Sequence, residues 1–438
     1  MYMESGSRYR YPILRGREKA DVAVVGGGLT GLSAAFWLAK SGLRVALAEA
    51  KTIGSGSSAY NCGILAPCHQ MMYARISDEK GISAAEKFAQ THIEAIQSIR
   101  ALSTNPGFSF ELQERNGLLA AIKNSETAEL NHETETMRKV GLPAESVSFS
   151  DASDPGAAFI KVPYVYRINA SRYLMQLACN AEKLKAKLFE NSRVTAVEVD
   201  AVYTESGSIQ APYIVIATGY PIINIPGWYF LRLEQKKIYL YQTEKRHDSD
   251  HVIMAADGSY TCIPGETNDL WRINGGFVGT QTGEEGILTS RLRIKKKEDR
   301  IAIDTYAPDR IPYIGRYSSK TPNIFVGCGY GGSGLAGSMI AAQAITAQIL
   351  GLPSAEFDIY SPIHRTISFH DLLRSGRQYA NGLFGGFGAP RCSHMGCCLI
   401  YQPSSHLWEC PCHGSRFDNI GRVVNAPATR PVHLHKRK

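Results

Sequence analysis

A short apolar run that leads directly into glycines and then into a helix restricts the fold of this chain more than any other feature. The run Asp21–Val25 is typical of a buried parallel strand, and a helix is expected over Leu32–Ser41. Gly26, Gly28 and Gly31 lie between them in the pattern G-x-G-x-x-G. Glycines here permit a tight turn and a close backbone approach, and the N-terminus of the helix faces an anionic group.

The second strand of this unit ends in an acidic residue. It is expected over Arg44–Glu49, so Glu49 follows Gly31 by 18 residues. A carboxylate at this place accepts hydrogen bonds from ribose hydroxyls and would repel a 2′-phosphate. The strand, turn, helix and terminal acid together predict a dinucleotide site, whereas the glycines alone would also fit an ordinary turn.

A second match to the glycine pattern occurs late in the chain. Gly329, Gly331 and Gly334 join an expected strand, Asn323–Gly329, to an expected helix, Leu335–Leu350. No second strand with a terminal acid follows this helix, so a second nucleotide site for NAD(P) is the weaker alternative. We favour a helix N-terminus directed at another anionic group, such as the N1–C2 edge of a reduced flavin.

Composition and charge limit the class of protein and its partners. The chain has 438 residues, of which 44% are hydrophobic and 20% charged, which is typical of a globular protein of two or three domains. It has no apolar window long enough to cross a membrane, and its first twenty residues do not resemble a secretion signal, which predicts a cytoplasmic protein. The net charge is +8, but the basic stretches 291–297 and 436–438 contain no interleaved aromatic residues. No nucleic-acid partner is therefore expected.

The cysteines point to a metal site at the C-terminal end. Five of the ten cysteines lie in the last 47 residues, where Cys392 and His394 form C-x-H and Cys410 and His413 form C-x-x-H. Such a cluster in a chain without a secretion signal indicates a metal site before a disulfide framework. Two Cys and two His could hold zinc, although the spacing departs from that of a zinc finger. Zinc and purely structural cysteines remain alternatives at this point.

This segment closely resembles a Rieske domain. The resemblance implies that Cys392 and Cys410 hold one iron of a [2Fe–2S] cluster. It implies that His394 and His413 hold the other iron, where imidazole in place of thiolate raises the reduction potential.

The same resemblance implies roles for neighbouring residues. Cys397 and Cys412 match the pair that forms a disulfide in respiratory-type Rieske proteins. Ser415 is expected to donate a hydrogen bond to a cluster sulfur, whereas Phe417 replaces the tyrosine of the highest-potential members. Only the glycine-rich stretch 385–391 precedes the first ligand, so the domain is shortened relative to its family.

The rest of the chain, from about residue 20 to 352, resembles the FAD-dependent amine oxidoreductases of the D-amino-acid oxidase and glycine oxidase superfamily. The matching segments are Asp21–Gly31, Ser55–Gly63, Ile216–Pro221, Asp309–Gly315 and Gly327–Leu335. The resemblance implies FAD as the cofactor. The implied FAD-binding residues are Gly26, Gly28, Gly31 and Glu49 at the ADP half, Val194, Thr218 and Gly219 along the adenosine side, Ser57 and Ser58 in the serine-rich loop, and Gly315, Gly329, Gly331, Gly334 and Leu335 along the isoalloxazine side.

The two resemblances together predict the architecture. An α/β FAD-binding domain of the Rossmann type, with an inserted antiparallel α+β substrate domain, is expected over 18–360. Its FAD-binding parts are expected at about 18–100, 150–225 and 305–352, and its substrate-binding parts at about 101–149 and 226–304. A small, shortened all-β Rieske domain is expected over 385–438.

Three residues of the expected substrate sheet are weaker candidates. Arg272, Tyr239 and Tyr241 could clamp a substrate carboxylate by paired hydrogen bonds. A surface arginine and tyrosines that merely pack in the sheet are the favoured interpretation. No catalytic residue is assigned.

Cys62, Cys68 and His69 follow the serine-rich loop that should pass near the flavin. Some relatives attach flavin covalently, but a buried thiol and a loop histidine are the favoured interpretation for these residues.

The implied function is that of an FAD-dependent dehydrogenase. It would take a hydride from a small substrate, at the C–N bond of an amine or amino acid, and pass electrons singly to the Rieske cluster and an outside acceptor. The alternative is an electron-relay or redox-sensing protein without a metabolic substrate. The segment 280–304 is shorter than is usual in the family, which slightly favours that alternative.

Overall fold

The computed structural model describes residues 11–121, 126–148, 158–245, 250–278, 284–292, 294, 298–365, 376–377, 379–380, 382–384, 388–403 and 405–434. The basic tail 436–438, part of the stretch 291–297, and residues 385–387 of the glycine-rich stretch lie outside these ranges. None of the helices described is both long and apolar enough to pass through a membrane.

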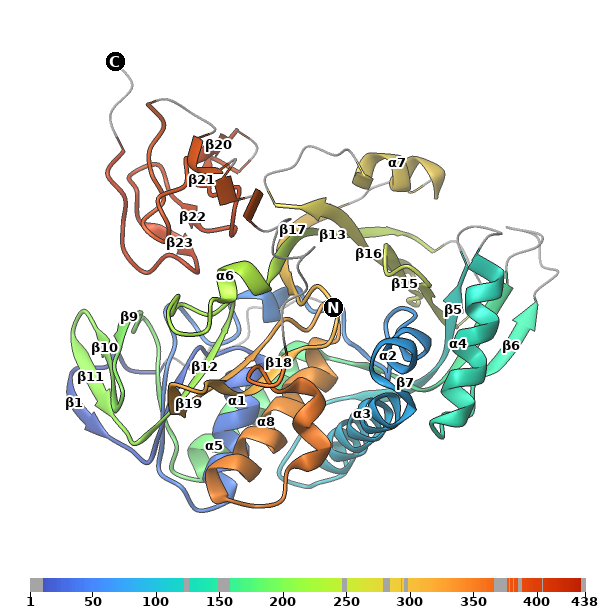
Figure 1. The fold of residues 1–438 in the computed structure, drawn as a ribbon, viewed down its shortest axis with the longest axis horizontal. Coiled ribbons are helices and arrows are strands. Elements are labelled where there is room, and N and C mark those ends of the chain that lie inside the picture. The colour runs from blue at the N-terminus through green and yellow to red at the C-terminus, as the bar shows by residue number, and fades with distance from the viewer. Residues whose placement is uncertain are drawn as a thin grey trace.

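A six-stranded sheet in the order β18-β19-β12-β2-β3-β8 forms the lower half of the molecule (Figure 1). Its strands are parallel except for β18. They are β2 (Val22–Val25), β3 (Val45–Ala48), β8 (Lys187–Phe189), β12 (Tyr213–Gly219), β18 (Tyr313–Ser318) and β19 (Thr321–Cys328). Every residue of β2 and β3 is buried, as expected for strands covered on both faces.

Helices cover one face of this sheet and a small sheet covers the other. On the helical face α1 packs against both α5 and α8, and α3 packs against α8. These helices are α1 (Leu29–Lys40), α3 (Ile82–Ser103), α5 (Ala170–Lys183) and α8 (Gly334–Leu350). The small sheet joins β1 (Gly16–Lys19), β9 (Val194–Val197), β10 (Ala201–Thr204) and β11 (Gly207–Gln210), and its apolar residues share a buried cluster with Ala23 and Val25 of β2.

A nine-stranded mixed sheet forms the upper arch of the molecule (Figure 1). Its strands are β4 (Ile64–Leu65), β5 (Leu112–Ala120), β6 (Glu145–Ser148), β7 (Ala158–Ile168), β13 (Glu234–Glu244), β14 (His251–Ala255), β15 (Tyr260–Ile263), β16 (Asn268–Phe277) and β17 (Glu298–Tyr306). The remaining helices are α2 (Tyr73–Lys80), α4 (Thr127–Lys139), α6 (Tyr229–Arg232) and α7 (Glu284–Arg291), with short 3₁₀ helices η1 (Ser57–Tyr60) and η3 (Ala355–Tyr360).

The C-terminal module is a four-stranded antiparallel sheet that lies above α6 (Figure 1). It contains β20 (Ile400–Gln402), β21 (Leu407–Glu409), β22 (Arg416–Phe417) and β23 (Val423–Asn425). Its core is small and consists largely of cysteines, with Phe417 fully buried among them.

Two expected boundaries differ from the structure. β7 lies in 150–225, which we assigned to the FAD-binding part, but it pairs with β5 in the large sheet. Its hydrophobic pattern does not show which sheet it joins, because a strand of either sheet would look the same. The Rieske module also begins before residue 385, since Tyr379 packs on its core and the Cys398 N–H donates to the Gly382 carbonyl.

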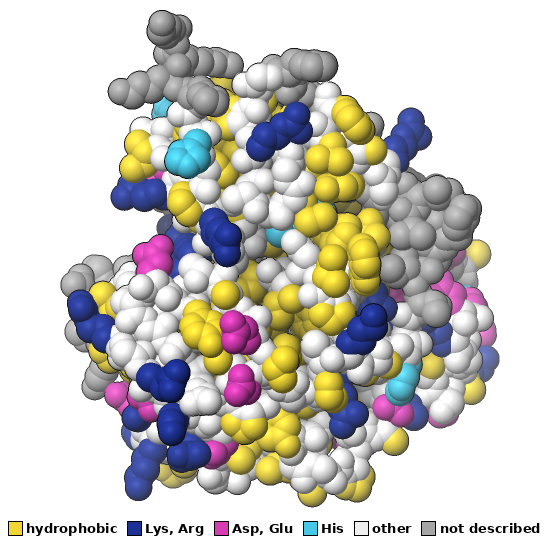
Figure 2. Space-filling model, turned by 60° about the vertical axis from the view of Figure 1, so that its left-hand side comes forward, with side chains coloured by type: hydrophobic (Ala, Val, Ile, Leu, Met, Phe, Trp, Pro, Cys, Tyr) yellow, Lys and Arg dark blue, Asp and Glu magenta, His cyan; other side chains and the backbone are white. Residues whose placement is uncertain are grey.

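The charged surface agrees with the scattered basic residues of the sequence. Figure 2 shows Lys and Arg side chains separated by uncharged ones over most of the visible face. The net charge of +8 therefore does not form one continuous basic band on this face.

Candidate active site and iron–sulfur centre

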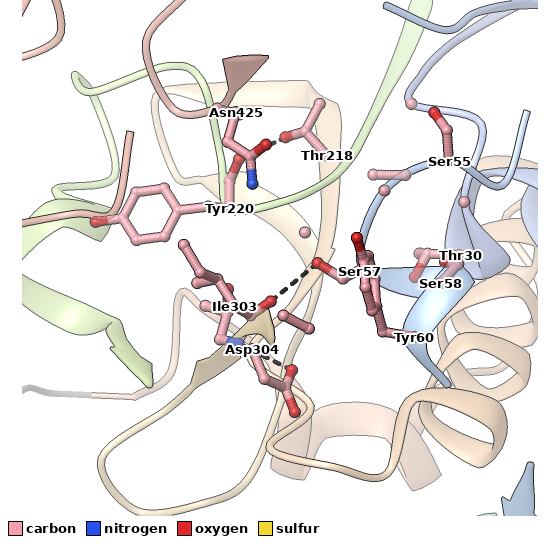
Figure 3. Close-up of a pocket in the computed structure, with 18 of the residues that line it drawn as sticks. Thr30, Ser55, Ser57, Ser58, Tyr60, Thr218, Tyr220, Ile303, Asp304 and Asn425 are labelled. Atoms are coloured by element: carbon pink, nitrogen blue, oxygen red, sulfur yellow. Dashed lines mark hydrogen bonds between the residues drawn. The ribbon is translucent and has the colours of Figure 1, made fainter. Parts of the chain in front are cut away.

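A cavity of about 460 Å³ opens where the carboxyl ends of the parallel strands meet the N-termini of α1 and α8. This is the usual position for a ligand on an open α/β sheet, and the volume is in the range of small-molecule sites. Of the expected FAD-binding residues, those that line it are Gly26, Gly28, Glu49, Ser57, Ser58, Val194, Thr218, Gly219, Gly329 and Gly334. Figure 3 shows Ser57, Ser58 and Thr218 around this cavity.

The turn after β2 is built so that only glycine fits at two positions. Gly26 has φ +107°, and a Cβ there would lie 2.5 Å from the Ala217 carbonyl oxygen of β12. A Cβ at Gly31 would lie 1.8 Å from the Gly26 carbonyl oxygen. Gly31 thus does not line the cavity but lets α1 approach the turn closely.

Glu49 braces the same turn from the end of β3. Its carboxylate accepts from the Gly27 N–H at 2.7 Å and from the Lys51 N–H at 2.8 Å. Burial raises the pKa of this carboxyl, and the two backbone N–H groups counteract part of the rise. The N-terminus of α1 points into the cavity, where the Ser58 hydroxyl accepts from the Leu29 N–H at 3.0 Å. A glycine turn, a helix N-terminus and an acid at the second strand fit the ADP half of FAD.

Other expected residues lie away from the cavity. Gly315 lies on β18, where a Cβ would meet the side chain of Gln348 on α8. Gly331 and Leu335 do not line the cavity, and the side chain of Leu335, in the first turn of α8, is buried in the core. The chain continues from α8 into η3, so no second strand completes a nucleotide fold here.

The weaker candidates of the sequence analysis differ in whether they line the cavity. Tyr239 and Tyr241 stack on each other at 6.1 Å and do not line the cavity, as expected of sheet packing. Arg272 is not a surface residue: its side chain is 12% exposed and lines the cavity. Cys62 lines the cavity, whereas Cys68 and the neighbouring histidine lie in a separate small pocket.

That neighbour, His69, is held neutral, because burial lowers its pKa to about 3. Burial raises the pKa of the Cys62 thiol, which makes it a poor nucleophile. These surroundings favour structural roles for both side chains.

Two six-residue loops in the C-terminal module have the same form. The Cys392 N–H donates to the Cys397 carbonyl, and the Cys410 N–H donates to the Ser415 carbonyl, both at 2.8 Å. The fifth residue of each loop is a glycine with positive φ (+76° and +66°). The two loops, which carry C-x-H and C-x-x-H, lie against each other, since the His394 and His413 rings are close and the Cys392 and Cys410 thiols are in contact.

The donor atoms of these loops fit a cluster with mixed ligands. The rings of His394 and His413 lie 5.1 Å apart at 88°. The Nδ1 atom of each ring is buried without a hydrogen-bond partner. The thiols of Cys392 and Cys410 are in hydrogen-bond contact, which lowers the pKa of Cys392 to about 7. Two buried thiols beside two unpartnered imidazole nitrogens match the ligands of a Rieske centre.

The neighbouring residues surround this donor set. The sulfurs of Cys397, Cys410 and Cys412 lie within 4.8 Å of one another. The fully buried Ser415 hydroxyl contacts the Cys392 thiol and accepts from the Ala428 N–H at 3.0 Å.

The histidine face of the module is turned toward the flavin domain. His394 Nε2 lies 2.5 Å from Asn224 Oδ1, and His413 Nε2 lies 3.2 Å from the Phe230 carbonyl oxygen. An ion pair of 3.2 Å between Lys237 of β13 and the buried Glu409 of β21 holds the two parts together.

The C-terminal module also forms one wall of the cavity. The lining includes Leu407, Arg416, Val424, Asn425, Ala426, Ala428 and Thr429 from this module. Figure 3 shows Asn425 beside Thr218 of β12. Sequence reasoning missed this wall, and it missed Asp304 of β17, because no local pattern marks a contact between segments so far apart in the chain.

Two known families match the two parts of the chain separately. The family described as FAD dependent oxidoreductase matches residues 21–348, and the Rieske [2Fe-2S] domain matches residues 388–436. The chain belongs to the FAD-dependent oxidoreductase family. It carries a C-terminal Rieske domain, so its cofactors are FAD and a [2Fe–2S] cluster.

Relatives agree with this assignment. The chain is 22% identical over 484 residues to the Rieske 2Fe-2S iron-sulfur protein YhfW of Bacillus subtilis, covering 96% of this chain and 94% of the relative. Its fold is similar to that of glycine oxidase from Geobacillus kaustophilus (TM-score 0.66, 20% identity, 80% of this chain and 100% of the other). It is also similar to L-proline dehydrogenase from P. horikoshii (TM-score 0.65, 20% identity, 79% and 97%).

Replacing Glu49 by Gln tests the ADP half of the site. The amide keeps the shape but loses the charge that strengthens hydrogen bonds to backbone N–H groups and ribose hydroxyls. We expect the Kd for FAD to rise about tenfold, or roughly 1.4 kcal/mol. Flavin fluorescence titration of apoprotein measures it. Glu18→Gln, which alters a surface pair with Lys187, is the control and should leave the Kd unchanged. An unchanged Kd in Glu49→Gln would exclude this role.

Proposed function

We propose that this protein is an FAD-dependent dehydrogenase that oxidises the C–N bond of a small amine or amino acid. It passes the electrons singly to its own Rieske cluster and then to an outside acceptor. The family match supports the oxidoreductase activity, and the arrangement of the two cofactor sites supports the electron transfer.

The single observation that carries this proposal is the position of Tyr220. Thr218, Gly219 and Tyr220 follow one another along the chain, and all three line the cavity. The buried Tyr220 ring lies 5.9 Å from the His413 ring and 6.3 Å from the His394 ring. Electron transfer needs a short path, and here a residue that lines the cavity also lies beside both cluster histidines.

The cofactors would be held by the residues described above. Gly26, Gly28 and Glu49 would hold the ADP half of FAD. When bound, FAD supplies the acceptor for a hydride from the carbon next to the substrate nitrogen, and the cluster supplies a carrier of single electrons. We also propose that Cys392, His394, Cys410 and His413 are the cluster ligands, with a disulfide between Cys397 and Cys412 that ties the two loops together.

Anaerobic addition of amines and amino acids to purified holoprotein tests the proposal. A substrate should bleach the flavin absorption band and then produce the paramagnetic signal of a reduced Rieske cluster. If no compound bleaches the flavin while a one-electron partner protein reduces both centres, the alternative of a relay without a substrate is correct.

Replacing Asn224 by Leu tests the contact between the two parts. An acceptor on the outer nitrogen of a ligating imidazole makes it more basic, which stabilises the oxidised cluster. Loss of one hydrogen bond, about 1 kcal/mol, should raise the potential by roughly 40 mV for one electron. A redox titration followed by electron paramagnetic resonance measures this shift.

Met395→Leu is the matched control. Asn224 Nδ2 donates to Met395 Sδ at 3.2 Å, so this variant removes the neighbouring contact but keeps the acceptor for His394. It should leave the potential near that of the unaltered protein. Equal potentials in Asn224→Leu and the unaltered protein would rule out a tuning role for Asn224.

A further inference from the structure

An ion pair lies on the wall of the cavity at the loop that begins α8. Arg272 of β16 donates through Nη2 to Asp304 Oδ2 at 3.0 Å and to the Tyr306 hydroxyl at 2.9 Å. A Cβ on Gly332 would lie 3.4 Å from Arg272 Nη2, so the pair lies against the loop assigned to the flavin ring. Figure 3 shows the Asp304 carboxylate at the edge of the same cavity.

The end of the cavity at the α8 loop carries little net positive charge. The described lining residues with a cationic side chain are Lys51, Arg193, Arg272 and Arg416. The positive charges of Lys51 and Arg193 lie near Glu49 at the ADP end, where they lower the pKa of its carboxyl. Arg416 pairs with Glu409 at 2.8 Å. Arg272 is therefore the cation at the α8 loop among the described residues, and Asp304 neutralises it.

The pair disfavours a substrate that carries a carboxylate next to the reacting carbon. A carboxylate is bound best by an arginine that offers two parallel N–H donors. Here one Nη of Arg272 is already shared between Asp304 and Tyr306, and an incoming carboxylate would meet the negative charge of Asp304 in a buried site. Like charges brought together in a low-dielectric site repel each other strongly.

The same geometry suits an amine. Asp304 Oδ1 accepts from the Thr305 N–H at 2.9 Å and Oδ2 accepts from Arg272, so each oxygen keeps a free lone pair. The Asp304 side chain is 29% exposed and lines the cavity. A substrate N–H can therefore donate to a carboxylate that is already fixed in orientation.

We propose that the substrate is an amine without a carboxylate on its reacting carbon, that Asp304 binds its nitrogen, and that Arg272 is the positioning residue for Asp304. This inference rests on the proposed function. The reaction is unchanged: the C–H bond next to nitrogen breaks, its hydride goes to the bound flavin, a proton leaves the nitrogen for solvent, and a C=N bond forms.

Two ligands with the same tert-butyl group and opposite charge test the binding step. tert-Butylammonium and pivalate (trimethylacetate) differ in the charged group, and neither has a hydrogen on the carbon that would react. Each is titrated into oxidised holoprotein while the flavin absorption band is followed. We expect saturable binding of tert-butylammonium and at least tenfold weaker binding of pivalate. Equal or tighter binding of pivalate, or no binding of tert-butylammonium, would overturn the proposal.

Asp304→Asn should reverse this preference. Binding of tert-butylammonium should weaken at least tenfold, and binding of pivalate should tighten at least tenfold because Arg272 becomes free. Asp21→Asn, which alters the surface pair with Arg44 at the opposite end of β2, is the control and should change neither.

Arg272→Gln keeps the test decisive if Asp304→Asn fails to fold. This variant retains the carboxylate and should still bind tert-butylammonium, whereas pivalate binding should be lost. Pivalate binding that survives in Arg272→Gln would overturn the charge argument.

Matched substrates separate failure of this inference from failure of the proposed function. Ethylamine and the two enantiomers of alanine differ by one carboxylate on the reacting carbon. Faster flavin bleaching by ethylamine than by alanine supports the inference. Faster bleaching by alanine overturns it but leaves the dehydrogenase intact. No bleaching by any member of a wider set of amines and amino acids overturns both.

Discussion

Gly31→Val is expected to yield protein without FAD. The new side chain would begin 1.8 Å from the Gly26 carbonyl oxygen, which is backbone and cannot rotate away. Gly26 has little room to move away, because it packs closely against β12. An ideal Cβ built on Gly26 would lie 2.5 Å from the Ala217 carbonyl oxygen. We expect a loss of about 3 kcal/mol or more in the free energy of unfolding, together with loss of the nucleotide turn.

The flavin-to-protein ratio and the melting temperature of the purified variant measure this effect. Gly28→Ala is the matched control. Its Cβ would meet the side chain of Ser58, whose hydroxyl at 2.8 Å is the end of a side chain that can rotate. Gly28→Ala should therefore weaken FAD binding without unfolding the domain. A Gly31→Val protein with stoichiometric FAD and an unchanged melting temperature would show that the turn is not packed as described.

Cys410→Ala is expected to abolish the [2Fe–2S] cluster while FAD remains bound. Cys410 is fully buried between the two loops, in contact with the Cys392 thiol. Its removal leaves one thiolate where an iron requires two, so the cluster should be lost. An amine should still bleach the flavin in this variant, but electrons should no longer reach an outside acceptor at an appreciable rate.

Iron and acid-labile sulfide per chain measure the cluster, and the flavin spectrum measures FAD. Cys398→Ala is the matched control, because Cys398 is also buried in the module but lies outside the proposed ligands. It should keep both iron and sulfide. Full iron content in Cys410→Ala would contradict the ligand assignment.

Local features of this protein could be predicted from its sequence because their physics is local. The glycines between β2 and α1 and the two loops with cysteine and histidine each need special residues within a few positions. The β-strand pattern of 213–219 and the helical pattern of 335–350 agree with β12 and α8. Each of these elements follows from hydrophobic periodicity and turn chemistry.

The contacts that decide function could not be predicted in this way. His394 meets Asn224, 170 residues earlier in the chain, and neither residue carries a local signal for the other. Arg272 looks like a surface residue in an alternating strand. Asp304 reaches it from β17, which lies on the other side of β13 in the large sheet. The place of β7 in the large sheet could not be predicted for the same reason, because strand pairing depends on the whole fold.

The most direct test of the account is an anaerobic reduction of the holoprotein by an amine that bleaches its flavin. Samples are frozen at intervals and examined by electron paramagnetic resonance for the reduced Rieske cluster. The account predicts that this signal rises after the flavin bleaches and approaches one cluster per chain, in the absence of any other protein. Complete bleaching of the flavin with a cluster that stays oxidised would contradict it.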